Sequence, residues 1–200
     1  EIFTSINKYF NTETNAEITL EANPGDISFK YLEKIRNLGI NRLNIGIQSF
    51  DDKILQLLGR RHSEKEAFAS IEAARQAGFN NLGIDLIYGV RGMSFKSWIN
   101  TLHQAVSFRP EHISCYQLSL GEKTPLYMKY SLNKWHLPDE NTELKLFLST
   151  SDELIHAGYI HYEVSNFALK EKFKSRHNRK YWQHVPYLGL GASAHSFLNN

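Results

Sequence analysis

Apolar and polar residues follow a repeated order along the chain: a short apolar run, a turn, and then a run with helical spacing. Four apolar runs are expected to be strands, at residues 17–23, 42–48, 81–89 and 112–118. Ser28 has the position of a helix N-cap, and Ser63 with Glu66 has the spacing of a capping box. Gly39 and Gly78 stand where helices are expected to end. This alternation predicts parallel strands joined by crossover helices.

The later part of the chain continues the pattern with shorter signals. Pro138 stands where a first helical turn tolerates proline, and that helix is expected to run to about Gly158. Residues 159–167 predict a fifth strand, and residues 187–191 a sixth. A doubly wound sheet and a (β/α) barrel both fit this α/β order. Polar residues near the C-terminal ends of separate strands favour the barrel, and the length of 200 residues favours an incomplete one.

Composition and charge exclude several classes of function. The 23 basic and 21 acidic side chains leave a net charge of +2, which predicts no nucleic-acid partner. No apolar run is long enough to span a bilayer, and the first residues lack a signal-peptide pattern, so a cytoplasmic protein is expected. Cys115 is the single cysteine, which excludes a disulfide framework within these 200 residues, and it is expected to be a small buried apolar residue.

Four polar side chains are expected to face one cleft. Glu21, Gln48 and Asp85 fall toward the C-terminal ends of three strands, and Arg60 follows the second of them. Carboxylates accept hydrogen bonds from hydroxyl or ammonium groups, and a guanidinium can hold a carboxylate with two parallel bonds. These residues therefore suit a ligand with hydroxyls and a charged amino-acid end. A set of ion pairs and caps that order the loops is the alternative.

Two other segments carry weaker signals. The glycines of residues 189–194 come near a dinucleotide-binding spacing, but a glycine-rich turn explains them more simply. Residues 175–182 combine an imidazole, cations and two rings, which suits haem, yet from the residues alone a surface turn with inward-packed rings is favoured. The histidines have no H-x-x-x-H spacing, so a zinc site is not predicted.

Several motifs in order along the chain resemble the oxygen-independent coproporphyrinogen III oxidase family of radical S-adenosylmethionine proteins. The motifs are EANPG at 21–25, GIQSF at 46–50, LGR at 58–60, IDLIYG at 84–89, HYEVSNFA at 161–168 and YLGLG at 187–191. The resemblance covers residues 17–197. It implies a partial (β/α)6 barrel of the radical S-adenosylmethionine type, incomplete in this chain. Residues 17–168 are its best supported part, and residues 169–200 lead toward a further C-terminal region.

The resemblance assigns the polar strand-end set to S-adenosylmethionine. It implies that Arg60 holds the methionine carboxylate, that Gln48 and Asp85 serve the ribose hydroxyls or nearby polar atoms, and that Glu21 anchors the cofactor from its strand. Residues 177–182 match the H-N-x-x-Y-W signature of the haem chaperone branch of the family. The same resemblance makes His177 the candidate haem ligand. It implies haem or a porphyrinogen as ligand and a haem-accepting protein as partner, with membrane contact only through that acceptor.

The family's cluster motif, C-x-x-x-C-x-x-C, has no match in this chain. We therefore expect the ligands of the family's [4Fe–4S] cluster to precede Glu1 in a longer protein, and we expect no catalytic residue, no metal ligand and no radical chemistry in these 200 residues. Natural loss of the cluster is the less favoured explanation. A true coproporphyrinogen III oxidase and a non-catalytic β/α scaffold remain the alternative functions.

Overall fold

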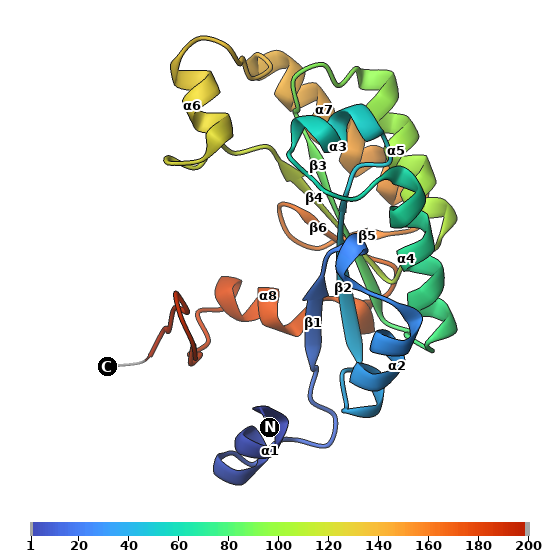
Figure 1. The fold of residues 1–200 in the computed structure, drawn as a ribbon, viewed down its shortest axis with the longest axis vertical. Coiled ribbons are helices and arrows are strands. Elements are labelled where there is room, and N and C mark those ends of the chain that lie inside the picture. The colour runs from blue at the N-terminus through green and yellow to red at the C-terminus, as the bar shows by residue number, and fades with distance from the viewer. Residues whose placement is uncertain (1, 199–200) are drawn as a thin grey trace.

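The computed structural model describes residues 2–198, which form one six-stranded sheet with helices packed against it (Figure 1). The strands are β1 (Thr19–Ala22), β2 (Arg42–Gln48), β3 (Leu82–Tyr88), β4 (His112–Gln117), β5 (Ile160–His161) and β6 (Asn166–Ala168). The α-helices are α1 (Ile2–Tyr9), α2 (Phe29–Asn37), α3 (Asp52–Leu57), α4 (Glu64–Gln76), α5 (Phe95–Ser107), α6 (Pro125–Ser131), α7 (Glu140–His156) and α8 (Arg176–Trp182). Short 3-10 turns occupy Pro24–Asp26 and Glu171–Phe173.

Strands β1 to β4 are parallel neighbours in chain order, as the sequence predicts. The predicted caps are present. The Ser28 side chain accepts from the Tyr31 amide, and Ser63 and Glu66 form a reciprocal capping box. Gly39 and Gly78 both have positive φ angles, which end the helices before them. Local signals therefore set the bounds of the first half of the sheet and of its crossover helices.

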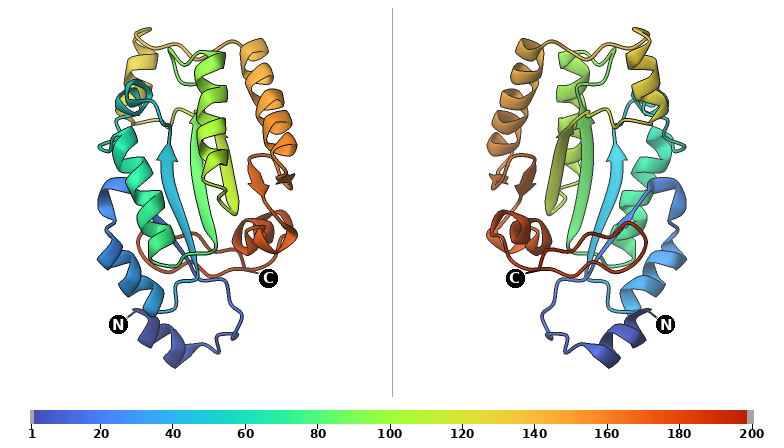
Figure 2. Two further views of the ribbon diagram at one scale, coloured as in Figure 1. Left: turned by 90° about the vertical axis from the view of Figure 1, so that its right-hand side faces the viewer. Right: turned by 90° about the vertical axis from the view of Figure 1, so that its left-hand side faces the viewer.

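Helices α2, α4, α5 and α7 all cover the same face of the sheet, which Figure 2 shows turned toward the viewer in its left panel. A doubly wound sheet would carry crossover helices on both faces. Helices on one face alone are the arrangement of a barrel wall, so the partial barrel prediction is confirmed.

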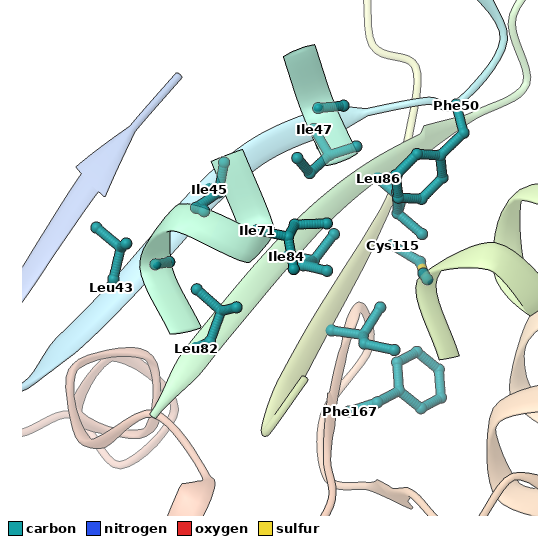
Figure 3. Packing of buried hydrophobic residues seen from close by; sticks show 14 of the residues in the cluster. Leu43, Ile45, Ile47, Phe50, Ile71, Leu82, Ile84, Leu86, Cys115 and Phe167 are labelled. Atoms are coloured by element: carbon teal, nitrogen blue, oxygen red, sulfur yellow. The ribbon is translucent and has the colours of Figure 1, made fainter. Parts of the chain in front are cut away.

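The core lies between these helices and the sheet. Leu43, Ile45 and Ile47 of β2 alternate with polar residues, and Ile84 of β3 points the same way toward Ile71 of α4 (Figure 3). All five side chains are almost fully buried. Burial of this apolar layer supplies the main stabilisation and fixes the register, since a slip of one residue would turn it to the opposite face.

The prediction for the end of the sheet is wrong in direction and length. Residues 159–167 do not form one fifth parallel strand. They contribute β5 and most of β6, two short strands that pair antiparallel with each other, and β6 is antiparallel to β4. Residues 187–191 make only an isolated bridge, between Tyr187 and Phe197, rather than a sixth strand. Pro138 precedes the N-cap Asp139, outside the first helical turn, although the helix ends before Gly158 as expected.

Within residues 2–198, no helix is both long enough and apolar enough to cross a membrane.

Candidate functional site

The sheet face opposite the helices carries polar side chains, and we call it the polar face. Side chains alternate across a strand, and the parallel register aligns neighbouring strands, so these residues share one face. They are Thr19, Glu21, Arg42, Asn44, Asp85, His112, Ser114 and Tyr116. Arg42, Asn44, His112 and Ser114 are buried nonetheless. Polar groups buried on an inner barrel face are the usual surroundings of a ligand.

Asp85 lies at the centre of this face. It is the fourth of the seven residues of β3, so the expectation that it stands toward the C-terminal end of its strand is wrong. The Asn44 side-chain amide donates to one carboxylate oxygen of Asp85, while the other oxygen is buried without a partner. Gly83 leaves the space that Asn44 fills, because a Cβ there would collide with the Asn44 amide oxygen. Asp85 therefore presents one unsatisfied acceptor.

Burial raises the pKa of the Asp85 carboxyl, and the negative charge of Glu21 raises it further. The Asn44 hydrogen bond, the neighbouring Ser114 hydroxyl and the positive charge of Arg42 oppose that rise in pKa without cancelling it. Glu21 and Asp85 thus act on each other electrostatically across β2. A donor from a ligand would satisfy the free oxygen of Asp85 and favour its ionised form.

Gln48 and Arg60 lie together at the C-terminal end of β2. Gln48 is buried and has a φ of 66°, and its side chain turns back over Gly46, where a Cβ would lie 2.7 Å from Nε2. The Arg60 guanidinium donates to the Asn23 side-chain oxygen at 3.2 Å. The same Asn23 oxygen lies near Gly46. Asn23, which follows β1 directly, therefore contacts Arg60 and lies beside Gly46, over which Gln48 turns back.

A pocket of about 280 Å³ opens at this corner. Its walls are Asn23, Gly25, Asp26, Gly59, Arg60, Arg61, His62 and Glu66. The His62 ring is held to the Ile47 carbonyl at 3.0 Å, which fixes the loop that carries Arg60 against β2. The four predicted ligand residues thus form two groups on adjoining strands: Gln48 with Arg60 at the strand ends, and Glu21 with Asp85 further down the polar face.

The segment with His177 is a helix, α8, rather than a surface turn. Its rings do not pack inward, since Tyr181 is 47% exposed and Trp182 is 59% exposed. The exposed His177 imidazole is 3.0 Å from the Tyr181 hydroxyl, and the two rings meet edge to face. Figure 1 shows α8 on the opposite side of the sheet from α2 and α4. A pocket of about 700 Å³ between α8 and β1 includes both His177 and Glu21 in its walls.

The single cysteine is buried in β4 on the helix-covered face, as expected for a small apolar residue. Burial raises the pKa of the Cys115 thiol well above its usual value. Among residues 2–198, no group of three or more histidine, cysteine or acidic side chains is placed to hold a metal ion. The residues described do not fit an iron–sulfur cluster, which is held by several thiolates.

Sequence reasoning missed Asn23, Arg42 and Asn44 as site residues. Asn23 and Arg42 both fall within motifs or strands that the sequence identified, but their side-chain directions follow from strand register. Arg42 is paired in register with Thr19, and Asn44 with Glu21. The polar alternation of β2, in which Asn44 and Gln48 interrupt the apolar residues, is the signal that could have found Asn44.

A parallel sheet with helices on one face and polar groups on the other defines the wall of a (β/α) barrel with a ligand-facing interior. Residues 2–105 match the radical SAM superfamily, and the chain belongs to that superfamily. Within the superfamily the chain is HemN-like. Its structure superposes on one titled coproporphyrinogen III oxidase (HemN) from Escherichia coli, with a TM-score of 0.78, 25% identity, and coverage of 98% of this chain and 48% of that one.

Curated relatives in this group carry two kinds of name. The heme chaperone HemW of Bacillus subtilis is 37% identical over 92% of this chain and 48% of its own length. A protein of Bos taurus named radical S-adenosyl methionine domain-containing protein 1, mitochondrial, is 37% identical over 90% of this chain and 41% of its own length. The chain therefore spans about half the length of these relatives or less.

Proposed function

We propose that the chain is the ligand-facing barrel wall of a haem chaperone, a protein that binds haem and delivers it to an acceptor protein. The observation that carries the proposal is the relatives named heme chaperone, at 32–37% identity, together with the H-N-x-x-Y-W segment on α8. The partners are haem and a haem-accepting protein. Localisation in the cytoplasm is part of the same proposal.

His177 is the residue proposed to ligate haem. It is exposed on α8, and an imidazole nitrogen is a common axial ligand of haem iron. Its Nε2 is near the Tyr181 hydroxyl, so that contact fixes the orientation of the ring. The exposed rings of Tyr181 and Trp182 supply apolar surface for a flat macrocycle.

S-adenosylmethionine is the second proposed ligand, and the residues at the strand-end corner fit it. The Arg60 guanidinium suits the methionine carboxylate, and Gln48 suits a ribose hydroxyl or a nearby polar atom. Asp85 retains a buried oxygen without a donor, which suits a hydroxyl, and Glu21 lies on the same face across β2. On one-electron reduction, bound S-adenosylmethionine supplies a 5′-deoxyadenosyl radical in this superfamily. The chain's own residues bind and orient the cofactor.

Replacing Arg60 with methionine is expected to weaken S-adenosylmethionine binding at least tenfold, because charge-assisted hydrogen bonds are worth about 1.5–3 kcal/mol each. The measurement is calorimetric titration of the full-length protein under anaerobic conditions. Arg91→Met is the matched control, since Arg91 donates to the Lys134 carbonyl, outside the pocket. Equal affinity in the Arg60→Met variant and the wild type would remove Arg60 from the cofactor site.

Coproporphyrinogen III oxidase activity is the second candidate function, and the structural likeness to the Escherichia coli enzyme favours it. The two functions separate in one assay of the full-length protein with coproporphyrinogen III, S-adenosylmethionine and a reductant. We expect no protoporphyrinogen, while an authentic oxidase assayed in parallel forms it. Product formed by the wild type and lost in the Arg60→Met variant would establish the oxidase and overturn the chaperone.

A further inference from the structure

Arg42 is a buried guanidinium without a partner on the polar face. It is the first residue of β2 and is only 5% exposed. Within residues 2–198, its side chain makes no hydrogen bond and no ion pair, and its Nε is buried unsatisfied. A buried unpaired charge is strongly unfavourable, since several kcal/mol of lost hydration go uncompensated. An anion from outside the chain would compensate the charge of this guanidinium.

The surroundings of Arg42 do not neutralise it. A Cβ on Gly83 would lie 3.5 Å from Nη2, so the absence of a side chain there makes room for the guanidinium. His112 beside it stays neutral, because burial and the Arg42 charge lower its pKa to about 3. The His112 Nε2 is 2.7 Å from the Tyr162 hydroxyl, and its Nδ1 is buried without a partner. The positive charge of Arg42 acts to lower the pKa of Asp85, but the two side chains form no ion pair.

Arg42 is part of the wall of the pocket of about 700 Å³ between α8 and β1. The acidic and basic side chains of that wall are Glu13, Glu17, Glu21, Arg42, Arg176 and Lys180, and His177 lines it as well. Glu17 is engaged already, since both of its oxygens accept from the backbone amide of Arg176. The Arg176 guanidinium donates to the Asn15 carbonyl. Among residues 2–198, Arg42 is therefore the one cationic side chain of this wall that is buried and has no hydrogen-bond partner.

We propose that Arg42 is the anchor of a carboxylate-binding site in the pocket between α8 and the polar face. A guanidinium matches a carboxylate in shape and can hold it with two parallel hydrogen bonds. The inference rests on the proposed function for the identity of the ligand: the carboxylate is a propionate of haem, whose iron is proposed to reach His177 on the same pocket wall. The polar face thus binds the macrocycle near the N-terminal end of β2, where Arg42 lies, and S-adenosylmethionine near its C-terminal end, where Gln48 lies.

The test compares haem with haem dimethyl ester, which has the same ring and iron but no free carboxylate. Both are titrated into the full-length protein and followed by the Soret band. Arg42→Met is expected to weaken haem binding at least tenfold and to leave ester binding unchanged. Arg42→Lys, which keeps the charge without the planar fork, is expected to give an intermediate loss. Arg91→Met is the control, because Arg91 is exposed after β3 and lies outside this pocket, and it should change neither affinity.

Unchanged haem affinity in Arg42→Met, or an equal loss for haem and for the ester, would overturn the proposal. The melting temperature of the ligand-free variant gives a second readout. It is expected to equal or exceed that of the wild type, since a buried unpaired charge has been removed. A lower melting temperature with equal loss of both ligands would mark Arg42 as structural. If Arg42→Met does not fold, the losses of affinity for haem and for the ester are compared in Arg42→Lys instead.

A wild type that binds neither haem nor the ester would overturn the proposed function, and glutarate then tests the carboxylate site by itself. Glutarate is expected to raise the melting temperature of the wild type and to leave that of Arg42→Met unchanged. If Arg42→Met does not fold, Arg42→Lys is expected to show a smaller rise than the wild type. An equal response to glutarate in wild type and variant, or no response in either, would overturn the site.

Discussion

Replacing Trp98 with alanine is expected to lower the free energy of unfolding by about 3–5 kcal/mol, the range for truncating a large buried aromatic side chain. Trp98 of α5 is fully buried and packs against Tyr88 of β3, with ring centres 5.4 Å apart. Its indole N–H donates to the Thr150 hydroxyl of α7 at 2.8 Å. The ring thus joins two crossover helices to the sheet, and its removal leaves a cavity among all three elements.

Chemical denaturation of the wild type and three variants measures this effect. Trp98→Phe keeps most of the packing and removes the hydrogen bond, and Thr150 still donates to the Leu146 carbonyl, so a smaller loss of about 1–2 kcal/mol is expected. Trp182→Ala, at an exposed tryptophan of α8, should change stability by no more than about 0.5 kcal/mol. Equal losses for Trp98→Ala and Trp182→Ala would contradict the packing described.

The first half of the fold is predictable from local signals. The capping box of Ser63 and Glu66 and the positive φ of Gly39 act within a few residues of the chain, so the sequence shows where those helices begin and end. The apolar runs at β2 and β3 are long and buried, which leaves no alternative pairing of similar stability. Parallel order then follows, since each connection contains a helix.

The end of the sheet could not be predicted in the same way. The two residues of β5 and the three of β6 are too short to show a period, and their direction is set by pairing with β4. The chain reverses within residues 162–165, where the Tyr162 amide donates to the Asn166 carbonyl. Nothing in the residue types of this segment distinguishes a tight reversal from a continuous strand.

The candidate site was predictable in part. Gln48, Glu21 and Asp85 are polar residues within strands, and Arg60 lies in the loop between α3 and α4. Polar residues within apolar runs are a visible signal. Arg42 was not visible in this way, because an arginine that begins a strand is usually solvated. Only the register of β1, β2 and β3 and the position of α8 show that its guanidinium is buried in a pocket wall.

Replacing His177 with alanine is expected to weaken haem binding by the full-length protein at least tenfold and to shift the Soret band, because the iron loses its axial imidazole. His156→Ala is the matched control, since His156 is an exposed helical histidine whose Nδ1 is near its own helix carbonyl at Asp152. Tyr181→Phe removes only the hydroxyl near the His177 ring and is expected to cause a smaller loss of affinity.

Haem titration of the wild type, His177→Ala and His156→Ala is therefore the most direct test of the haem chaperone account. The account predicts saturable binding with the same Soret band in the wild type and His156→Ala, and at least tenfold weaker binding with an altered Soret band in His177→Ala. A wild type that does not bind haem, or a His177→Ala variant with the affinity and spectrum of the wild type, would contradict it.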